Sequence, residues 1–241
     1  MKEYDTLLIG AGYSSFGYAA ARGRCLVVEE QEIADTHFYL PLRSFCHTPY
    51  TPSTAEGRRL EEHFRALGLF RDGRQNVNGF EVALCRYLTE NPLSLLLKTR
   101  VVRQCREGER TVVALIGNGG LSEVACRRVI DTHAGKGERL TVLLTASSRA
   151  EAEGAARQCG FSVTDAFYPG QYALFAPFTG EINETKLAVA EALRGCPGIR
   201  ILAMAQAPAA AGEGALLSDD DHENPIAAFE AGYLLGKEVA P

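Results

Sequence analysis

Clusters of basic residues are missing from this sequence of 241 residues. The formal net charge is -5 at pH 7, and the densest basic pairs are only Arg58-Arg59 and Arg127-Arg128. Binding to a nucleic-acid backbone depends on clustered lysine and arginine. The composition therefore argues against nucleic acid as a main partner.

Long apolar runs and closely spaced cysteine pairs are missing as well. No apolar stretch is long enough to cross a bilayer, so we expect no membrane span. The first residues, Met1 to Asp5, lead into an apolar run without the features of a secretory signal. The seven cysteines are widely spaced and form no CxxC pair, which argues against a zinc site. We expect free thiols, no metal and a cytoplasmic protein.

What the sequence does contain is a compact βαβ pattern at its start. Residues 4–10 form a short apolar run that ends in glycine, as a buried parallel strand does. Residues 16–21 predict a helix, and residues 25–28 predict a second strand.

The turn between the first strand and the helix carries the motif Gly10-x-Gly12-x-x-Ser15. The first glycine permits the tight turn, and the second lets the backbone approach a pyrophosphate. The free amides at the start of the helix, including those of Tyr13 and Ser14, would then hold that group. The alternative is a glycine turn that binds no ligand.

Two acids follow the second strand and complete the motif. An acid at this position accepts hydrogen bonds from a ribose. Glu29 is the first candidate, because it directly follows the apolar run, and Glu30 is its substitute.

Further elements follow from the pattern of apolar residues and turns. Residues 31–55 are irregular and are interpreted as a loop of active-site type. The expected elements after this loop are helices at 55–67 and 80–89, a strand at 94–102, a hairpin of 111–116 and 121–126, and a short strand at 128–131. Residues 138–205 read as βαββαβ, a ferredoxin-like pattern, and residues 226–237 predict a last helix.

Taken together, these segments resemble the FAD-dependent oxidoreductases with two dinucleotide-binding domains, the glutathione-reductase-like type, in a shortened form. Residues 5–29, 98–135 and 221–232 carry the resemblance. It implies an α/β fold with a Rossmann-like FAD-binding domain built on a parallel sheet. That domain would comprise residues 1–137 and 206–241. An inserted smaller α+β domain, residues 138–205, would interrupt it.

The resemblance also implies contacts for several residues. The backbone of Val101 would contact the adenine, and Thr132 and Gly135 would lie against the FAD. Asp221 would bind the ribityl or phosphate oxygens. The helix beginning at Pro225 and Ile226 would point its N-terminus at the flavin.

Some of these positions have other interpretations. Asp219 to Asp221 also suit a solvated acidic turn that caps the last helix, and Thr132 with Gly135 suits a plain turn at a strand end. The family's glycine pair after the ribose-binding acid is absent, and Arg43 or Ser44 would substitute for it.

We therefore expect an FAD-binding oxidoreductase that transfers a hydride from a small organic substrate to the flavin. The alternatives are a non-catalytic flavin- or nucleotide-binding protein and an NAD(P)-binding Rossmann enzyme. The sequence identifies no catalytic residue. The candidates for chemistry are Cys46, His47, His133 and His222, each of which also suits a structural role.

Overall fold

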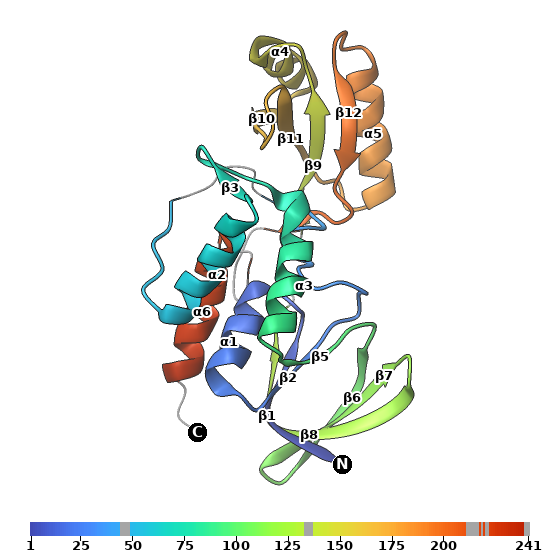
Figure 1. Cartoon of the computed structure of the whole chain (residues 1–241). Coiled ribbons are helices and arrows are strands. Elements are labelled where there is room, and N and C mark those ends of the chain that lie inside the picture. The colour runs from blue at the N-terminus through green and yellow to red at the C-terminus, as the bar shows by residue number, and fades with distance from the viewer. Residues whose placement is uncertain (44–48, 133–136, 211–216, 218, 220–221, 239–241) are drawn as a thin grey trace.

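The computed structural model describes residues 1–43, 49–132, 137–210, 217, 219 and 222–238. Two larger β-sheets, each accompanied by helices, make up most of the described molecule, and two short strands form a third, two-stranded sheet (Figure 1). In this described part of the chain, no helix is both long and apolar enough to span a membrane.

The first sheet is mixed rather than purely parallel. Its strand order is β5-β2-β1-β8-β7-β6. β1 runs parallel to β2 and β8, β2 runs parallel to β5, and β7 runs antiparallel to β6 and β8. The strands are β1 (Lys2–Ile9), β2 (Cys25–Val28), β5 (Ser94–Leu96), β6 (Arg100–Glu107), β7 (Arg110–Gly117) and β8 (Gly120–Asp131).

Two strand predictions in this sheet are wrong. Residues 128–131 are not a separate strand, because β8 continues through them from the predicted hairpin. The first part of β8 pairs with β7, and its last part pairs with β1, so that Asp131 lies opposite Ile9. The single strand expected at 94–102 is divided into β5 and β6 by a turn in which Lys98 has a φ of 50°.

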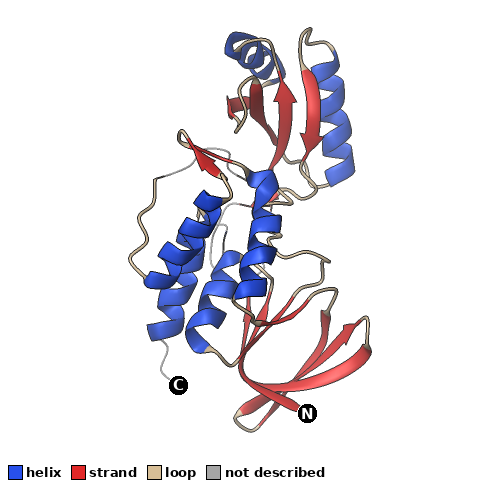
Figure 2. Cartoon of the chain, viewed as in Figure 1, coloured by secondary structure: helices blue, strands red, loops and turns tan. Residues whose placement is uncertain are grey.

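Four helices pack together beside this sheet (Figure 2). They are α1 (Tyr13–Arg22), α2 (Ala55–Ala66), α3 (Phe80–Glu90) and α6 (Pro225–Glu238), close to the predicted ranges. α1 and α6 touch at their backbones. A Cβ atom added to Gly17 would lie 1.8 Å from the carbonyl oxygen of Phe229, and one added to Gly232 would lie 1.9 Å from that of Ser14.

The second sheet follows the predicted βαββαβ order. Its strands have the order β10-β11-β9-β12, and every neighbouring pair is antiparallel. The elements are β9 (Gly137–Thr145), α4 (Arg149–Cys159), β10 (Ser162–Asp165), β11 (Gln171–Pro177), α5 (Ile182–Arg194) and β12 (Arg200–Met204). The short strand β13 (Ala209–Ala210) pairs with β9.

Four very short elements of the described chain were not predicted from the sequence. They are β3 (Phe70–Arg71), β4 (Arg74–Gln75), β13 and a 3-10 turn at Val77–Gly79. Two-residue strands carry too little alternation to be recognised in a sequence.

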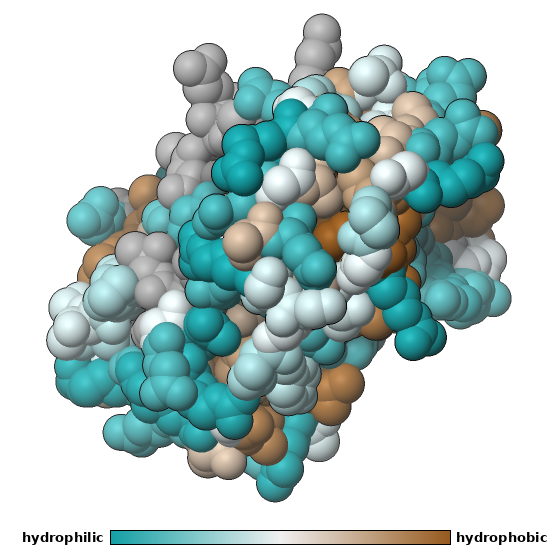
Figure 3. Space-filling view, turned by 90° about the horizontal axis from the view of Figure 1, so that it is seen from above, coloured by the Kyte–Doolittle hydropathy of each residue, from teal (hydrophilic) through white to brown (hydrophobic). Residues whose placement is uncertain are grey.

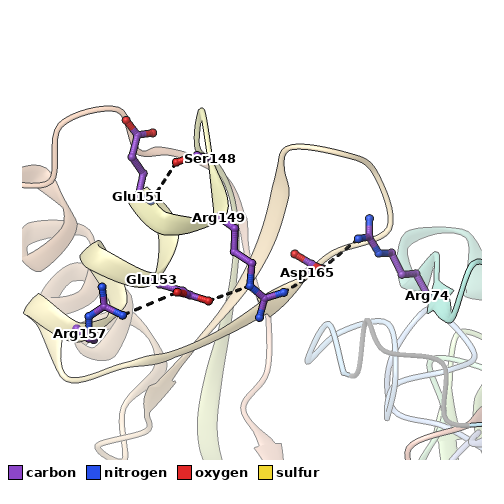
Figure 4. Close-up of polar contacts among 7 residues, drawn as sticks. All are labelled: Arg74, Ser148, Arg149, Glu151, Glu153, Arg157 and Asp165. Carbon is purple, nitrogen blue, oxygen red and sulfur yellow. Dashed lines mark hydrogen bonds and ion pairs between the residues drawn. The ribbon is translucent and has the colours of Figure 1, made fainter.

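A chain of charged side chains joins this hairpin to the second sheet (Figure 4). Asp165 accepts hydrogen bonds from Arg74 at 3.1 Å and from Arg149 at 3.0 Å. Arg149 also donates to Glu153 at 2.8 Å, and Arg157 lies 3.8 Å from the same carboxylate. These charged groups are partly exposed, so each ion pair contributes little to stability. Together the ion pairs link the β3–β4 hairpin to the second sheet.

Viewed from above, the molecule is mostly hydrophilic, with a few apolar areas between polar ones (Figure 3). The second sheet and its surroundings expose single large apolar side chains on separate elements, namely Tyr168, Leu187 and Leu202. Exposed apolar residues of this kind are ordinary for a protein surface.

Candidate functional site

The motif predicted to bind a pyrophosphate forms a strand–turn–helix unit. Gly10 directly follows β1 and has a φ of 109°, a conformation that favours glycine, and its amide donates to the Val28 carbonyl at 2.8 Å. α1 then begins at Tyr13, with Gly12 as its N-cap residue. Because Gly12 has no side chain, the amides of the first helical turn receive no local cap.

A carboxylate from the other end of the chain binds these amides. Tyr13 N donates to Asp219 Oδ2 at 2.6 Å, and Ser14 N donates to Asp219 Oδ1 at 2.8 Å. Asp219 is only 1% exposed. A negative charge is favourable at a helix N-terminus, and each oxygen receives one charge-assisted hydrogen bond. The alternative interpretation of the acidic turn was a solvated cap of the last helix, but its described residue Asp219 is buried and caps the first helix.

Of the two acids after β2, Glu29 alone turns into the motif. Glu29 is 1% exposed and accepts hydrogen bonds from Ala11 N and from Gln31 N, both at 2.9 Å. Glu30 is exposed and lies 3.4 Å from Arg100. Glu29 is therefore the acid that faces the motif, and its contact with a ribose stays a prediction.

The residue that follows β8, Thr132, is hydrogen-bonded to the end of β1 beside the same turn. The amide and the hydroxyl of Thr132 both donate to the Ile9 carbonyl at 2.8 Å. Ser15 Oγ donates to Thr132 Oγ1 at 3.3 Å. The serine at the third motif position thus makes a hydrogen bond that a glycine could not make.

A buried pair of acidic groups lies next to the motif. The Tyr13 hydroxyl donates to Asp35 at 3.2 Å, and Asp35 also accepts the amide of Phe38 at 3.0 Å. Burial raises the pKa of Asp35, the amide of Phe38 opposes this, and the charge of Asp219 adds to the rise. Burial also raises the pKa of Tyr13, and the charge of Asp35 raises it further.

An Asp35→Asn variant is expected to be more stable than the wild type at pH 7, by on the order of 1 kcal/mol. Because the folded-state pKa is raised, the carboxyl group contributes stability that is complete below its ordinary value of 3.8 and is lost as the pH rises toward the folded value. Asparagine tolerates the φ of 63° at this position. Urea unfolding at several pH values measures the difference, which should vanish below pH 3.8. A variant that is less stable at pH 7 would contradict this account.

The other predicted residues lie in different surroundings. Arg43 is buried, and its guanidinium carbon lies 6.0 Å from the centre of the Phe38 ring. Val101 lies on β6 and packs against a cluster of buried apolar side chains that includes Leu115. Pro225 begins α6, and the amide of Ile226 donates to Asn224 Oδ1 at 2.9 Å. Contacts of these residues with a ligand stay predictions.

Several candidates fall outside the described residues. These are Ser44, Cys46, His47, His133, Gly135 and Asp221. His222 is described, and its amide donates to the Asp219 carbonyl at 3.0 Å. Where the chain is described, no group of three or more His, Cys, Asp or Glu residues could hold a metal ion.

Sequence reasoning missed two residues that enclose Gly12. A Cβ atom at Gly12 would lie 2.5 Å from Asp219 Oδ2 and 3.1 Å from His37 Cδ2. No local signal marked His37, which stands in the irregular loop, and Asp219 was noticed only as part of an acidic turn. The donors of the motif are thus suited to an anion, and the space over Gly12 is held by the chain's own carboxylate.

No protein-family model matches the chain, and no curated protein matches it. Solved structures share its fold. They include p-nitrophenol 4-monooxygenase PnpA from Pseudomonas putida DLL-E4, with a TM-score of 0.52 and 13% identity over 85% of this chain and 67% of that one. OxyS anhydrotetracycline hydroxylase from Streptomyces rimosus has a TM-score of 0.54 and 16% identity over 84% of this chain and 51% of its own.

A flavoprotein/dehydrogenase from Cytophaga hutchinsonii has a TM-score of 0.54 and 14% identity, over 98% of this chain and 77% of that one. The chain thus spans between about half and three quarters of the length of these three neighbours. At such low identities the likeness concerns the fold. It agrees with the predicted α/β class, in a mixed sheet that contains parallel strands.

Proposed function

We propose that the chain binds FAD at the turn between β1 and α1 and is an oxidoreductase acting on a small organic substrate. One observation carries the proposal: the N-terminus of α1 already binds an anion, with two amides donating to Asp219 at 2.6 and 2.8 Å. The same donors suit the diphosphate of a dinucleotide. The names of the three fold neighbours, a monooxygenase, a hydroxylase and a flavoprotein/dehydrogenase, support a redox function.

Each residue of the motif would contact a different part of FAD. Gly12 would allow the diphosphate to approach the backbone, and the amides of Tyr13 and Ser14 would bind it once Asp219 has left. Glu29 would accept hydrogen bonds from the ribose, because a carboxylate has about four acceptor positions. Glu29 now accepts the amides of Ala11 and Gln31 and, at 3.5 Å, the hydroxyl of Thr36. When bound, FAD would supply the redox chemistry by accepting a hydride from the substrate.

We propose that residues around the motif contact the rest of the cofactor. Thr132, which is fastened beside Ser15, would lie along the cofactor together with Gly135. The backbone of Val101 would contact the adenine, and Arg43 would offer a positive charge to the phosphates. Asp221 and the start of α6, at Pro225 and Ile226, would face the flavin end.

We also propose a division of the chain into two domains. Residues 1–137 and 206–241 would form the FAD-binding domain, and residues 138–205 an inserted ferredoxin-like domain that carries substrate contacts. The antiparallel strand order β10-β11-β9-β12, with helices between β9 and β10 and between β11 and β12, supports this interpretation. The cysteines of the described ranges are free thiols, which suits a cytoplasmic location.

Asp219 also favours a second candidate function. A chain that fills its own diphosphate position could keep the fold of a flavoenzyme while acting as a non-catalytic flavin- or nucleotide-binding protein. Bleaching of the flavin absorbance of the loaded protein by a candidate substrate under anaerobic conditions supports the oxidoreductase. Tight FAD binding without reduction by any of a broad panel of small organic substrates favours the second candidate.

A Gly12→Val variant tests the position of the site. Its side chain would fill the space over the first helical turn, so FAD affinity should fall by about 100-fold or more. Titration of FAD, followed by quenching of its fluorescence, measures the affinity, and circular dichroism checks the fold. The matched control is Gly119→Val, since a Cβ atom at Gly119 meets nothing within 4 Å. Equal affinity of Gly12→Val and the wild type would refute the site.

A further inference from the structure

The hydrogen bonds between Asp219 and α1 bear on how the proposed site is regulated. The two amides involved, those of Tyr13 and Ser14, are consecutive and lie in the first helical turn. Each donates to a different carboxylate oxygen, so Asp219 holds both at once. These are the donors on which a helix N-terminus depends to bind a phosphate.

The carboxylate also occupies the space that a phosphate would need. A Cβ atom at Gly12 would lie 2.5 Å from Asp219 Oδ2 and 2.9 Å from Asp219 Cγ. Asp219 therefore lies directly over the backbone of Gly12, where the missing side chain leaves room. Two negative groups at this one place would repel each other and compete for the same two donors.

Ser14, one of the two residues whose amides hold Asp219, also carries a polar side-chain group without a partner in the described part of the chain. Ser14 is 2% exposed, and its hydroxyl has no hydrogen-bond partner among the residues that the structure describes. A buried hydroxyl without a partner is unfavourable, and a phosphate oxygen would accept a hydrogen bond from it. The Asp219 carboxylate satisfies the amide of Ser14 but leaves its hydroxyl unpaired.

We propose that Asp219 is an internal competitor of the cofactor, which occupies the diphosphate position in the FAD-free protein and must leave before FAD can bind. This inference rests on the proposed function. Release of Asp219 breaks two charge-assisted hydrogen bonds, so only a fraction of the FAD-free molecules is open. The apparent affinity for FAD is the intrinsic affinity multiplied by that open fraction. Asp219 thereby sets the concentration of FAD at which the site fills, and it keeps the helix N-terminus capped until then.

Removing the carboxylate tests the competition. Asp219→Ala should bind FAD at least about tenfold more tightly than the wild type, because no internal anion has to be displaced. Asp219→Asn should change the affinity in the same direction, since the amide lacks the charge and can accept only one of the two hydrogen bonds. Titrations by flavin fluorescence quenching measure these affinities. Without FAD, both variants should melt at a lower temperature than the wild type, because α1 loses its cap.

Asp72→Asn is the matched control, since Asp72 is an exposed acid in the β3–β4 turn whose φ of 51° asparagine tolerates. It should bind FAD as the wild type does. Asp219→Asn keeps the test valid if Asp219→Ala does not fold. Equal FAD affinity of the wild type and both Asp219 variants would overturn the competition but leave the proposed function intact. Weaker binding by the folded variants would also overturn it, and would make Asp219 a ligand of the cofactor. Failure of the wild type and of both variants to bind FAD would overturn the proposed function and the competition together.

Discussion

A Gly232→Ala variant is expected to lose about 2–4 kcal/mol of unfolding free energy, although the change adds a single methyl group. The new Cβ atom would lie 1.9 Å from the carbonyl oxygen of Ser14 and 2.7 Å from its carbonyl carbon. These are backbone atoms of α1, which cannot turn aside as a side chain can. The two helices would have to separate, and buried side chains of both helices, such as Phe16 and Phe229, would lose packing contacts.

The matched control is Gly154→Ala in α4. Gly154 is also an interior helix glycine, but a Cβ atom there meets nothing within 4 Å. This variant should gain about 0.5–1 kcal/mol from the better helix propensity of alanine. Chemical denaturation followed by circular dichroism compares the two. If Gly232→Ala were as stable as Gly154→Ala, the close contact of α1 and α6 would be wrong.

A Glu230→Ala variant is expected to lose about 2–4 kcal/mol, because it removes the acceptor of three part-buried hydrogen bonds. Glu230 is 1% exposed on α6 and accepts the hydroxyl of Tyr50, the amide of Ser53 at 3.0 Å and that of Thr54 at 2.5 Å. Thr54 is the N-cap residue of α2, and its side chain accepts the amide of Gly57. Glu230 thus joins the last helix to the start of the second.

Two controls separate the causes of this loss. Glu230→Gln keeps an acceptor but removes the charge, so it should lose less than the alanine variant. Glu191→Ala removes an exposed glutamate of α5 and should stay within about 0.5 kcal/mol of the wild type. A loss as small for Glu230→Ala as for Glu191→Ala would contradict the predicted role.

The same interaction predicts a dependence on pH. Burial alone would raise the pKa of Glu230, but the hydrogen bonds from Thr54, Tyr50 and Ser53 outweigh it and lower the pKa below its ordinary value of 4.5. An acid with a lowered pKa contributes stability above its ordinary value, and this contribution is lost as the pH falls through the folded value. The stability difference between the wild type and Glu230→Gln should therefore shrink below pH 4.5.

Local patterns predicted most of the fold. The second strand, 25–28, agrees with β2, and the last helix, 226–237, agrees with α6 to within one residue at each end. These elements have a continuous apolar run or a clear helical period bounded by turn residues. The prediction of a separate strand at 128–131 was wrong because this segment has no turn residue at its start to separate it from the hairpin. β8 changes its partner from β7 to β1 without a break.

The contacts that complete the site were beyond prediction because they join distant parts of the chain. Asp219 binds amides that lie more than 200 residues earlier, and its neighbours in the acidic turn looked equally suitable. Gly17 and Gly232 each resemble an ordinary weak point in a helical pattern. Only the contact between α1 and α6 shows that these two glycines allow the helix backbones to approach each other. By contrast, the sequence alone drew attention to Glu29 and Thr132, since each directly follows the end of a strand that pairs with β1. Their contacts with a cofactor stay predictions.

The contact between α1 and α6 has a consequence for synthesis of the protein. The ribosome makes α6 some 200 residues after α1. Until α6 has left the exit tunnel, the glycine-bearing face of α1 has no partner, and closing so large a loop is slow. The nascent chain therefore emerges with the turn between β1 and α1 incomplete, and we expect a chaperone to be able to bind that face before folding is complete.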